Sequence, residues 1–131
     1  MNEIARLITG VQHVGISVSD MDIAVKFYEA LGFEAILRTA DEKTGRPVVF
    51  MQLKGLMVEL YHGRQSSGRS GAIDHIAVNV TDIEAAFDKV RKLGYPVVEG
   101  GICSLPFWTS GVRFFTICGP QAEHVEFSQV M

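Results

Sequence analysis

Two histidines and two glutamates of this chain stand where they could act together on one metal ion. His13 and His75 each begin a short run of alternating apolar residues, and Glu59 and Glu126 each follow a valine inside an apolar segment. A carboxylate among apolar strand residues is costly unless it is paired or bound to a metal. Imidazole nitrogens and carboxylate oxygens form a mixed ligand set for divalent transition metals. Taken singly, each residue has a plainer explanation, because a lone histidine is commonly a core or rim residue and a lone glutamate commonly faces solvent.

An internal repeat favours the joint explanation. The segment VQHVGISVSDMDIAVKFYEALGFE aligns with IDHIAVNVTDIEAAFDKVRKLGYP at an offset of 62 residues, which is the separation of His13 and His75. The two glutamates are separated by 67 residues, and the longer loop CSLPFWTSG of the second copy accounts for the difference. Four polar residues that obey one repeat relation are hard to explain by packing alone. We therefore predict a metal site formed by His13, Glu59, His75 and Glu126.

The elements that must position these residues form the same series in each copy. In the first copy, alternation predicts a strand over 14–18, and helical spacing predicts a helix over 20–31. Ser19 or Asp20 can cap this helix, and Gly32 supplies a left-handed stop. The apolar residues at helical spacing are Ile23, Phe27 and Leu31.

The second copy predicts a matching strand and helix. Thr81 and Glu84 fit a capping box, and Gly94 ends the helix. The apolar residues at helical spacing are Ile83, Phe87, Val90 and Leu93. Further strands are expected in RPVVFMQL, LMVELYH, VRFFTI and EHVEFSQV.

This order of elements, β-α-β-β-β twice, predicts an α+β fold made of two βαβββ modules. The modules are expected over residues 9–62 and 72–130, with a polar linker over 63–71. Each module is marginal in length for folding alone, so we expect one domain over 1–131 with a shared core.

Composition excludes several other classes of protein. The chain has 131 residues, a net charge of −3 and a pI of about 5.8, so it carries no basic surface for nucleic acid or for an acidic membrane. No window has the length of a membrane span, and the N-terminal segment lacks the apolar run of a signal peptide. Cys103 and Cys118 do not form a disulfide framework, which suits a cytoplasmic protein.

The repeat segments HVGISVSDMDIAVKFYEALGFE and DHIAVNVTDIEAAFDKVRKLGY, with the ending GPQAEHVEFSQ, resemble the vicinal oxygen chelate superfamily. This superfamily includes glyoxalase I, methylmalonyl-CoA epimerase, extradiol dioxygenases, and the fosfomycin and bleomycin resistance proteins. The resemblance implies two βαβββ modules whose curved mixed sheet surrounds a cleft with one divalent metal ion. It also implies a homodimer, with the cleft in some members built across the two chains.

The set of ligands distinguishes the members of the superfamily. His13, Glu59, His75 and Glu126 resemble the ligands of bacterial glyoxalase I. Epimerases have glutamine at the position of Glu59, and the dioxygenases and fosfomycin enzymes have no carboxylate there. The resemblance implies a lyase or isomerase that transfers a proton next to a carbonyl of a hemithioacetal or related α-hydroxycarbonyl. Glu126 is the first choice for the base and Glu59 the second, and the metal can be Ni, Co, Zn, Mn or Fe.

The chain differs from glutathione-using glyoxalases at Ser17 and Gly63, where those enzymes have arginine and asparagine. Arg113, or Arg64 and Arg69 of the linker, can supply the missing charge, although alternation places Arg113 with Phe115 and Ile117. Phe107, Trp108 and Tyr61 are further candidates for contact with a small-molecule substrate. The alternative functions are an acyl-CoA epimerase, an extradiol dioxygenase, and a resistance protein that sequesters a small molecule without metal.

Overall fold

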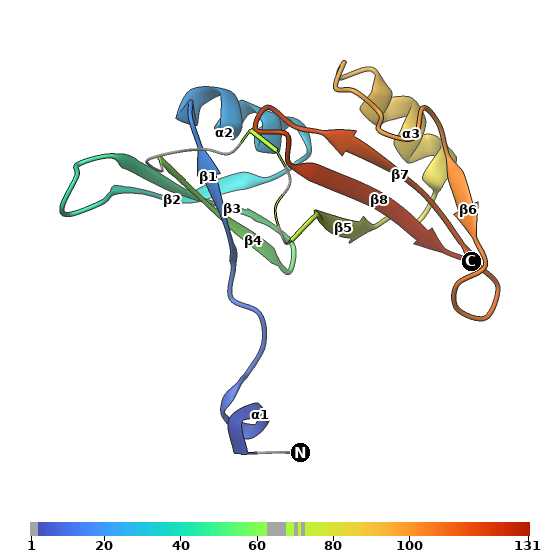
Figure 1. The fold of residues 1–131 in the computed structure, drawn as a ribbon, viewed down its shortest axis with the longest axis horizontal. Helices are drawn as coiled ribbons and strands as arrows, with labels where there is room; N and C mark the ends of the chain where they lie inside the picture. Colours follow the sequence, from blue (N-terminus) through green and yellow to red (C-terminus); the bar gives the residue numbers. More distant parts are fainter. Residues whose placement is uncertain (1–2, 63–67, 70, 72) are drawn as a thin grey trace.

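The computed structural model describes residues 3–62, 68, 69, 71 and 73–131, and it shows two four-stranded mixed sheets, each with one helix packed against it (Figure 1). This arrangement confirms the predicted α+β fold of two βαβββ modules, with one sheet in each module. Most of the predicted linker lies outside the described residues. A short helix, α1 (Glu3–Leu7), precedes the first module on an arm that points away from the sheets. None of the helices in the described residues is long and apolar enough to cross a membrane.

The first strand of each module pairs in parallel with the last strand of that module. The first sheet has the order β1-β4-β3-β2 and the second has the order β5-β8-β7-β6. The elements of the first module are β1 (Val14–Val18), α2 (Met21–Ala30), β2 (Glu34–Ala40), β3 (Pro47–Leu53) and β4 (Leu56–His62). Those of the second are β5 (His75–Asn79), α3 (Ile83–Arg91), β6 (Cys103–Leu105), β7 (Val112–Cys118) and β8 (His124–Val130). In each module, the strand at whose start the predicted histidine lies is therefore paired with the strand that carries the predicted glutamate.

Aspartates cap both helices. The Asp20 carboxylate accepts a hydrogen bond from the Ile23 backbone N–H at 3.0 Å, and Asp82 does the same for Ala85 at 3.0 Å. The predicted capping box of Thr81 and Glu84 is therefore wrong. Asp82 has the extended backbone that an N-cap requires, and it occupies the repeat position of Asp20.

The ends of the helices follow the prediction. Gly32 and Gly94 have φ angles of 102° and 86°, which lie in the left-handed region that glycine adopts without strain. The second strand of each module, β2 in the first and β6 in the second, was not among the segments predicted as strands. In the second module, Cys103, Ser104 and Leu105 fell in a segment that reads as a loop. These three residues form β6, which pairs with β7.

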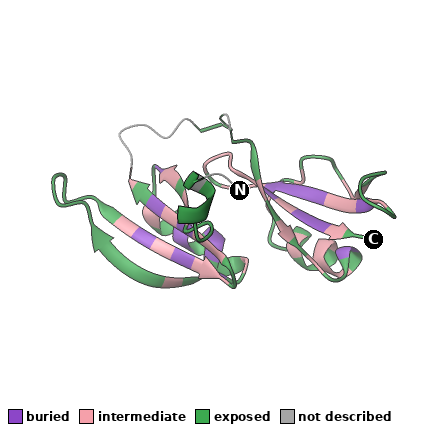
Figure 2. Cartoon of the chain, turned by 90° about the horizontal axis from the view of Figure 1, so that it is seen from below, coloured by how far each residue is buried: buried purple, intermediate pink, exposed green. Residues whose placement is uncertain are grey.

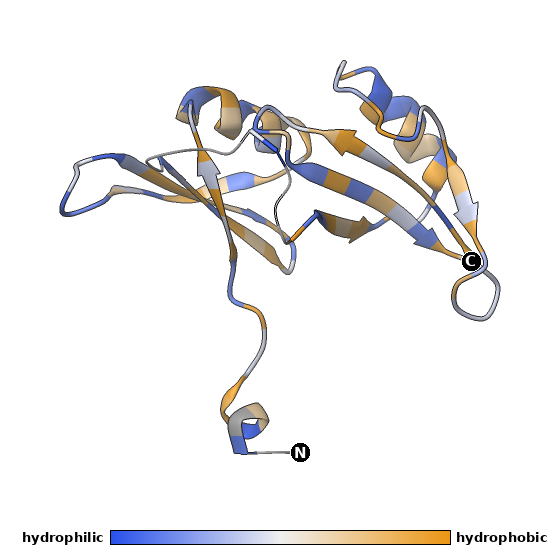
Figure 3. Ribbon diagram, viewed as in Figure 1, coloured by the Kyte–Doolittle hydropathy of each residue, from blue (hydrophilic) through white to orange (hydrophobic). Residues whose placement is uncertain are grey.

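Buried residues alternate with more exposed residues along β3, β4 and β8 (Figure 2). The buried residues of α2 are Ala24, Val25, Phe27 and Tyr28. Ile23 is 51% exposed, so the prediction that it lies on the buried face of α2 is wrong. The four buried residues define that face, and Ile23 lies at its margin. From His124 to Ser128 of β8, the buried apolar residues Val125 and Phe127 alternate with hydrophilic residues, and Figure 3 shows this alternation along the strand.

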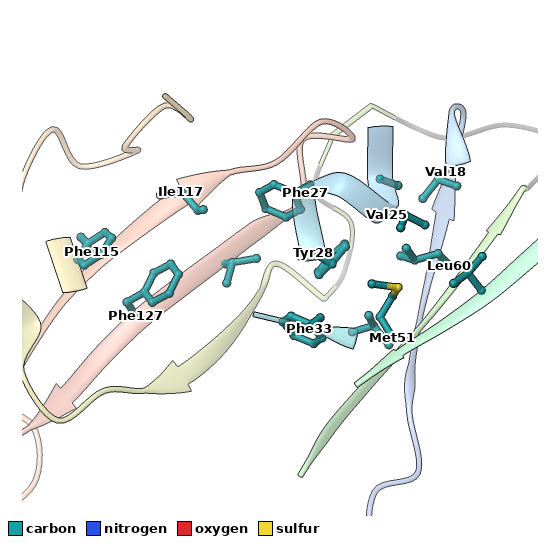
Figure 4. Close-up of a cluster of buried hydrophobic side chains, with 14 of the residues drawn as sticks. Val18, Val25, Phe27, Tyr28, Phe33, Met51, Leu60, Phe115, Ile117 and Phe127 are labelled. Atoms are coloured by element: carbon teal, nitrogen blue, oxygen red, sulfur yellow. The ribbon is translucent and has the colours of Figure 1, made fainter. Parts of the chain in front are cut away.

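Buried apolar residues of both modules belong to one contiguous cluster. Phe27 is completely buried, and its ring packs edge-to-face against Tyr95 of the second module with centroids 4.8 Å apart. Figure 4 shows Phe27 between the core side chains of the two sheets. The Tyr28 hydroxyl donates a hydrogen bond to Glu123 at 3.2 Å, across the same boundary.

Candidate functional site

The first module brings His13 and Glu59 together. In the parallel register of β1 and β4, Gly15 lies opposite Glu59, and His13 stands one residue before β1. The His13 Nε2 atom is 3.6 Å from the Glu59 Oε1 atom, and both side chains are about 30% exposed, at 30% and 28%. The ring of Phe50, which is opposite Glu59 on β3, packs edge-on against the His13 ring at 5.5 Å.

The second module brings His75 and Glu126 together in the same way. In the parallel register of β5 and β8, Ala77 lies opposite Glu126, and His75 is the first residue of β5. The His75 Nε2 atom is 3.7 Å from the Glu126 Oε1 atom. We call His13 with Glu59 the first half-site, and His75 with Glu126 the second half-site.

In both half-sites the second ring nitrogen of the histidine contacts the residue that precedes it. His13 Nδ1 is 2.9 Å from Gln12 Oε1, and His75 Nδ1 is 3.0 Å from Asp74 Oδ2. The hydrogen bond with His75 lowers the pKa of Asp74 below its ordinary value, and the nearby His124 ring acts in the same direction. These partners leave the Nε2 atom of each histidine directed at a glutamate.

The structure brings the four predicted ligands together in two pairs and does not bring the pairs together within one chain. Within the described residues, no group of three or more His, Cys, Asp or Glu side chains is placed to hold a metal ion. One chain therefore presents two separate pairs of one imidazole and one carboxylate each.

Gly15 and Tyr61 line the first half-site. A Cβ atom on Gly15 would lie 3.4 Å from Tyr61 Cε1 and 3.6 Å from Glu59 Oε1. The predicted substrate contact Tyr61 thus lies beside Glu59, with its side chain partly exposed. Gly15, Gln12 and Phe50 were not predicted as residues of the site. A lone glycine within a strand is a signal of close approach by another group, and it could have pointed to Gly15.

Arg113 lies on the opposite face of its sheet from Glu126. Its guanidinium donates a hydrogen bond to Glu84 of α3 at 3.1 Å, and its register partner Gln129 also contacts the start of α3. The alternation of β7 had placed Arg113 on this face. Glu126 faces the other way, opposite Thr116.

The remaining predicted substrate contacts lie elsewhere. Phe107 and Trp108 are 53% and 68% exposed in the loop between β6 and β7, with ring centroids 6.2 Å apart. Arg64 and Gly63 lie outside the described residues. Arg69 lines a cavity of about 210 Å³ between the modules, together with Ser17 of β1 and His75 of β5. The Ser17 hydroxyl is buried and has no hydrogen-bond partner among the described residues.

Curated proteins of known sequence include several relatives. The uncharacterized protein YwbC of Bacillus subtilis is 31% identical over 124 residues, which cover 91% of this chain and 96% of YwbC. An ethylmalonyl-CoA/methylmalonyl-CoA epimerase of Cereibacter sphaeroides is 30% identical over 105 residues, which cover 72% of this chain and 78% of the epimerase. A probable lactoylglutathione lyase of Vibrio parahaemolyticus is 27% identical over 108 residues, with the same coverage of 72% and 78%.

Solved structures share the fold. The structure of SMU.1112c superposes with a TM-score of 0.76 at 23% identity and covers 92% of this chain and 98% of its own. The fosfomycin resistance protein FosX of Listeria monocytogenes, solved with Mn(II) and sulfate, gives a TM-score of 0.72 at 16% identity and covers 95% and 94%. Residues 10–101 match the family model of the glyoxalase/bleomycin resistance protein/dioxygenase superfamily. With its two βαβββ modules and this match over most of its length, the chain belongs to that superfamily, which is also called the vicinal oxygen chelate superfamily.

Proposed function

We propose that this protein is a metal-dependent lyase or isomerase of the glyoxalase I type, which transfers a proton next to a carbonyl of a hemithioacetal or a related α-hydroxycarbonyl. One divalent ion would be held by His13, Glu59, His75 and Glu126. The observation that carries this proposal is the equivalence of the two half-sites, with Nε2 to Oε1 distances of 3.6 and 3.7 Å.

The donor atoms of each half-site fit a divalent ion. Nitrogen and carboxylate oxygen ligands lie about 2.0–2.2 Å from such ions, so two ligands of one ion are at most ~4.4 Å apart. Both Nε2 to Oε1 distances fall inside that limit. Glu59, the fourth proposed ligand, favours the glyoxalase type. At this position the chain resembles bacterial glyoxalase I and differs from the epimerases, the dioxygenases and the fosfomycin enzymes.

Two copies of the chain would complete the site. Each half-site supplies two ligands, and the half-sites of one chain do not meet, so a four-ligand site requires the first half-site of one copy and the second half-site of another. We therefore propose a homodimer with two-fold symmetry, in which each pair of half-sites forms across the interface. This arrangement would use every ligand and would give two identical sites.

The two glutamates would share the proton chemistry. The bound ion would polarise the substrate oxygens as a Lewis acid. Glu126 would remove the proton from carbon and return it to the neighbouring carbon, and Glu59 is the second candidate for this base. The Glu126 side chain is 21% exposed and lies on β8, so a substrate bound at the proposed metal site could reach its carboxylate.

The first experiment measures thioester formation from methylglyoxal and glutathione with metal-free protein reloaded with nickel, cobalt or zinc. The expected result is turnover with at least one metal, and a loss on the order of 100-fold or more in Glu126→Gln. Glu84→Gln is the matched control, because Glu84 lies on α3 and faces Arg113. Absence of turnover with the metal bound would refute the glutathione substrate. Full turnover by Glu126→Gln would refute the role of Glu126.

The second experiment tests whether the site is shared between chains. One variant carries His13→Ala with Glu59→Gln, and the other carries His75→Ala with Glu126→Gln. Neither variant alone should hold the ion at a complete site. An equal mixture that exchanges subunits should recover roughly a quarter of the wild-type metal content, because half of the dimers would be mixed and each would have one intact site. No recovery would show that the site does not form between chains.

A CoA thioester epimerase is the second candidate function. It is supported by the epimerase relative that is 30% identical to this chain. The same metal-loaded protein should then exchange the α-hydrogen of a methylmalonyl-CoA-like thioester with deuterium from solvent. Exchange of this hydrogen without turnover of the hemithioacetal would favour the epimerase.

A further inference from the structure

The carboxylate of Asp74 lies between two imidazole rings beside the second half-site. Asp74 Oδ2 is 3.0 Å from His75 Nδ1 and 3.8 Å from His124 Nδ1. The other nitrogen of His75, Nε2, lies 3.7 Å from Glu126. The two nitrogens of His75 thus face two different carboxylates, and only one of them, Glu126, belongs to the proposed ligand set.

The chemistry of Asp74 decides which nitrogen of His75 carries hydrogen. An ionised carboxylate accepts hydrogen bonds and donates none, so His75 Nδ1 must be the donor in this contact. A neutral imidazole has a single ring hydrogen, and its lone pair then lies on Nε2. That nitrogen is the one directed at Glu126, and a nitrogen with a free lone pair is the form that binds a metal ion.

The first half-site repeats this arrangement with an amide in place of the carboxylate. Gln12 precedes His13 as Asp74 precedes His75, and Gln12 Oε1 is 2.9 Å from His13 Nδ1. An amide carries both an acceptor and donors, so Gln12 can accommodate either neutral form of the His13 ring. Asp74 can accommodate only one such form of His75. The second histidine is therefore fixed more firmly than the first.

His124 is an additional feature of the second half-site. It lies opposite His75 in the register of β5 and β8, and its side chain is only 25% exposed. By the 67-residue offset of the last strands, its counterpart in the first module is Met57, which has no ring. Asp74 itself is 64% exposed, and exposed pairs of this kind contribute little to fold stability. The cluster is thus better suited to orienting His75 than to stabilising the fold.

We propose that Asp74 is a positioning residue, which accepts a hydrogen bond from His75 Nδ1 and thereby presents the Nε2 lone pair of His75 to the metal beside Glu126, while His124 holds the Asp74 carboxylate in place. The metal-binding part of this inference rests on the proposed function. The form of the His75 ring can be measured without any metal, and so its test is independent of that function.

The first test is nuclear magnetic resonance of metal-free protein with ¹⁵N-labelled histidines at pH 8, because the ¹⁵N shifts report which ring nitrogen carries hydrogen. The His75 signals are assigned by comparison with His75→Ala. In the wild type, Nδ1 should carry the hydrogen, and in Asp74→Ala the two neutral forms should mix. Asp88→Ala is the matched control, because this exposed aspartate of α3 bonds to Arg91 and Lys92. An unchanged His75 ring in Asp74→Ala would overturn the proposal.

The second test is the affinity for Ni²⁺ or Zn²⁺, measured by competition with a chelator. Loss of a carboxylate that orients a metal-bound histidine typically weakens metal binding about 10- to 100-fold, and Asp74→Ala should show a loss in this range. Asp74→Asn retains an acceptor oxygen and should lose less. Wild-type affinity in Asp74→Ala would refute the role of Asp74 in metal binding. Failure of the wild type to bind either ion would refute the proposed function, and the state of the His75 ring would still decide the role of Asp74.

Discussion

Gly15→Val should disrupt the first half-site without weakening the fold. Gly15 lies directly opposite Glu59, and a Cβ atom there would lie 3.6 Å from Glu59 Oε1 and 3.4 Å from the Tyr61 ring. Both distances are ordinary van der Waals contacts, so Gly15→Ala should fit. The position has no left-handed backbone, so a side chain causes no strain of φ.

Valine at this position would need more space than the half-site offers. Its methyl carbons lie ~1.5 Å beyond Cβ, so one of them would come within about 2–3 Å of the Glu59 carboxylate or the Tyr61 ring, where contact requires about 3.5 Å. Glu59 or Tyr61 must then shift by about 1 Å, which exceeds the tolerance of about 0.5 Å for a functional site. We expect metal affinity to fall about 10- to 100-fold. Stability should change by less than about 1 kcal/mol, because valine favours strands and position 15 is exposed.

The assay compares metal affinity by chelator competition with the thermal melting of metal-free protein, for wild type, Gly15→Ala and Gly15→Val. The repeat provides a natural precedent for the alanine control, since Ala77 lies opposite Glu126 in the second half-site. Wild-type metal affinity in Gly15→Val would refute the role of Glu59 as a ligand held against β1. An equal loss in Gly15→Ala would refute the reasoning from these distances.

Three further predictions concern stability. Phe27→Ala should lower the free energy of unfolding by about 3–5 kcal/mol in chemical denaturation, because the completely buried ring joins the two modules through Tyr95. Burial and the charge of Glu123 raise the pKa of the Tyr28 hydroxyl above its ordinary value of 10. The neutral hydroxyl therefore stabilises the folded chain fully below pH 10, and this contribution is lost as the pH rises above 10. Alkaline titration of stability should therefore show a steeper decline for wild type than for Tyr28→Phe. Backbone hydrogen bonds from Thr44 and Lys43 lower the pKa of the Asp41 carboxyl below 3.8. The difference in melting temperature between wild type and Asp41→Ala should therefore narrow as the pH falls below 3.8.

Most of the fold could be predicted from the internal repeat. The helices and the strands that carry the site could be predicted because their periodicity and glycine stops are local signals, and each occurs in both copies. The strands β2 and β6 were missed. Two local details were wrong for physical reasons. Thr81 and Asp82 are both good caps, and only the backbone of the folded chain shows that Asp82 is the one used. Ile23 has helical spacing, but the place of α2 on its sheet decides which side is buried.

The sequence could predict each pair of one histidine and one glutamate, but it could not predict how the two pairs are placed relative to each other. The first and last strands of a module had to be neighbours for His13 to meet Glu59, and the equal patterns of the two halves made that pairing a reasonable expectation. How two half-sites face each other depends on contacts between modules or between chains, which leave no periodic signal. The partner of Arg113 was hidden for the same reason, since Glu84 lies on a different element, 29 residues away.

Metal binding and association of two chains should be one linked equilibrium. In a single chain the half-site side chains remain partly exposed, at 30% and 28% for His13 and Glu59 and at 45% and 21% for His75 and Glu126, so water can solvate both carboxylates. Bringing two half-sites together without an ion would place two carboxylates side by side, and their repulsion opposes association. An ion that binds only the assembled site stabilises the dimer by about 2.7 kcal/mol per site at 100 times its dissociation constant, which is on the order of a 100-fold tighter dimer for each site. Sedimentation of wild type should show this dependence on metal, and His13→Ala should lose it. A wild-type dimer whose dissociation constant is the same with and without bound metal would contradict the shared site.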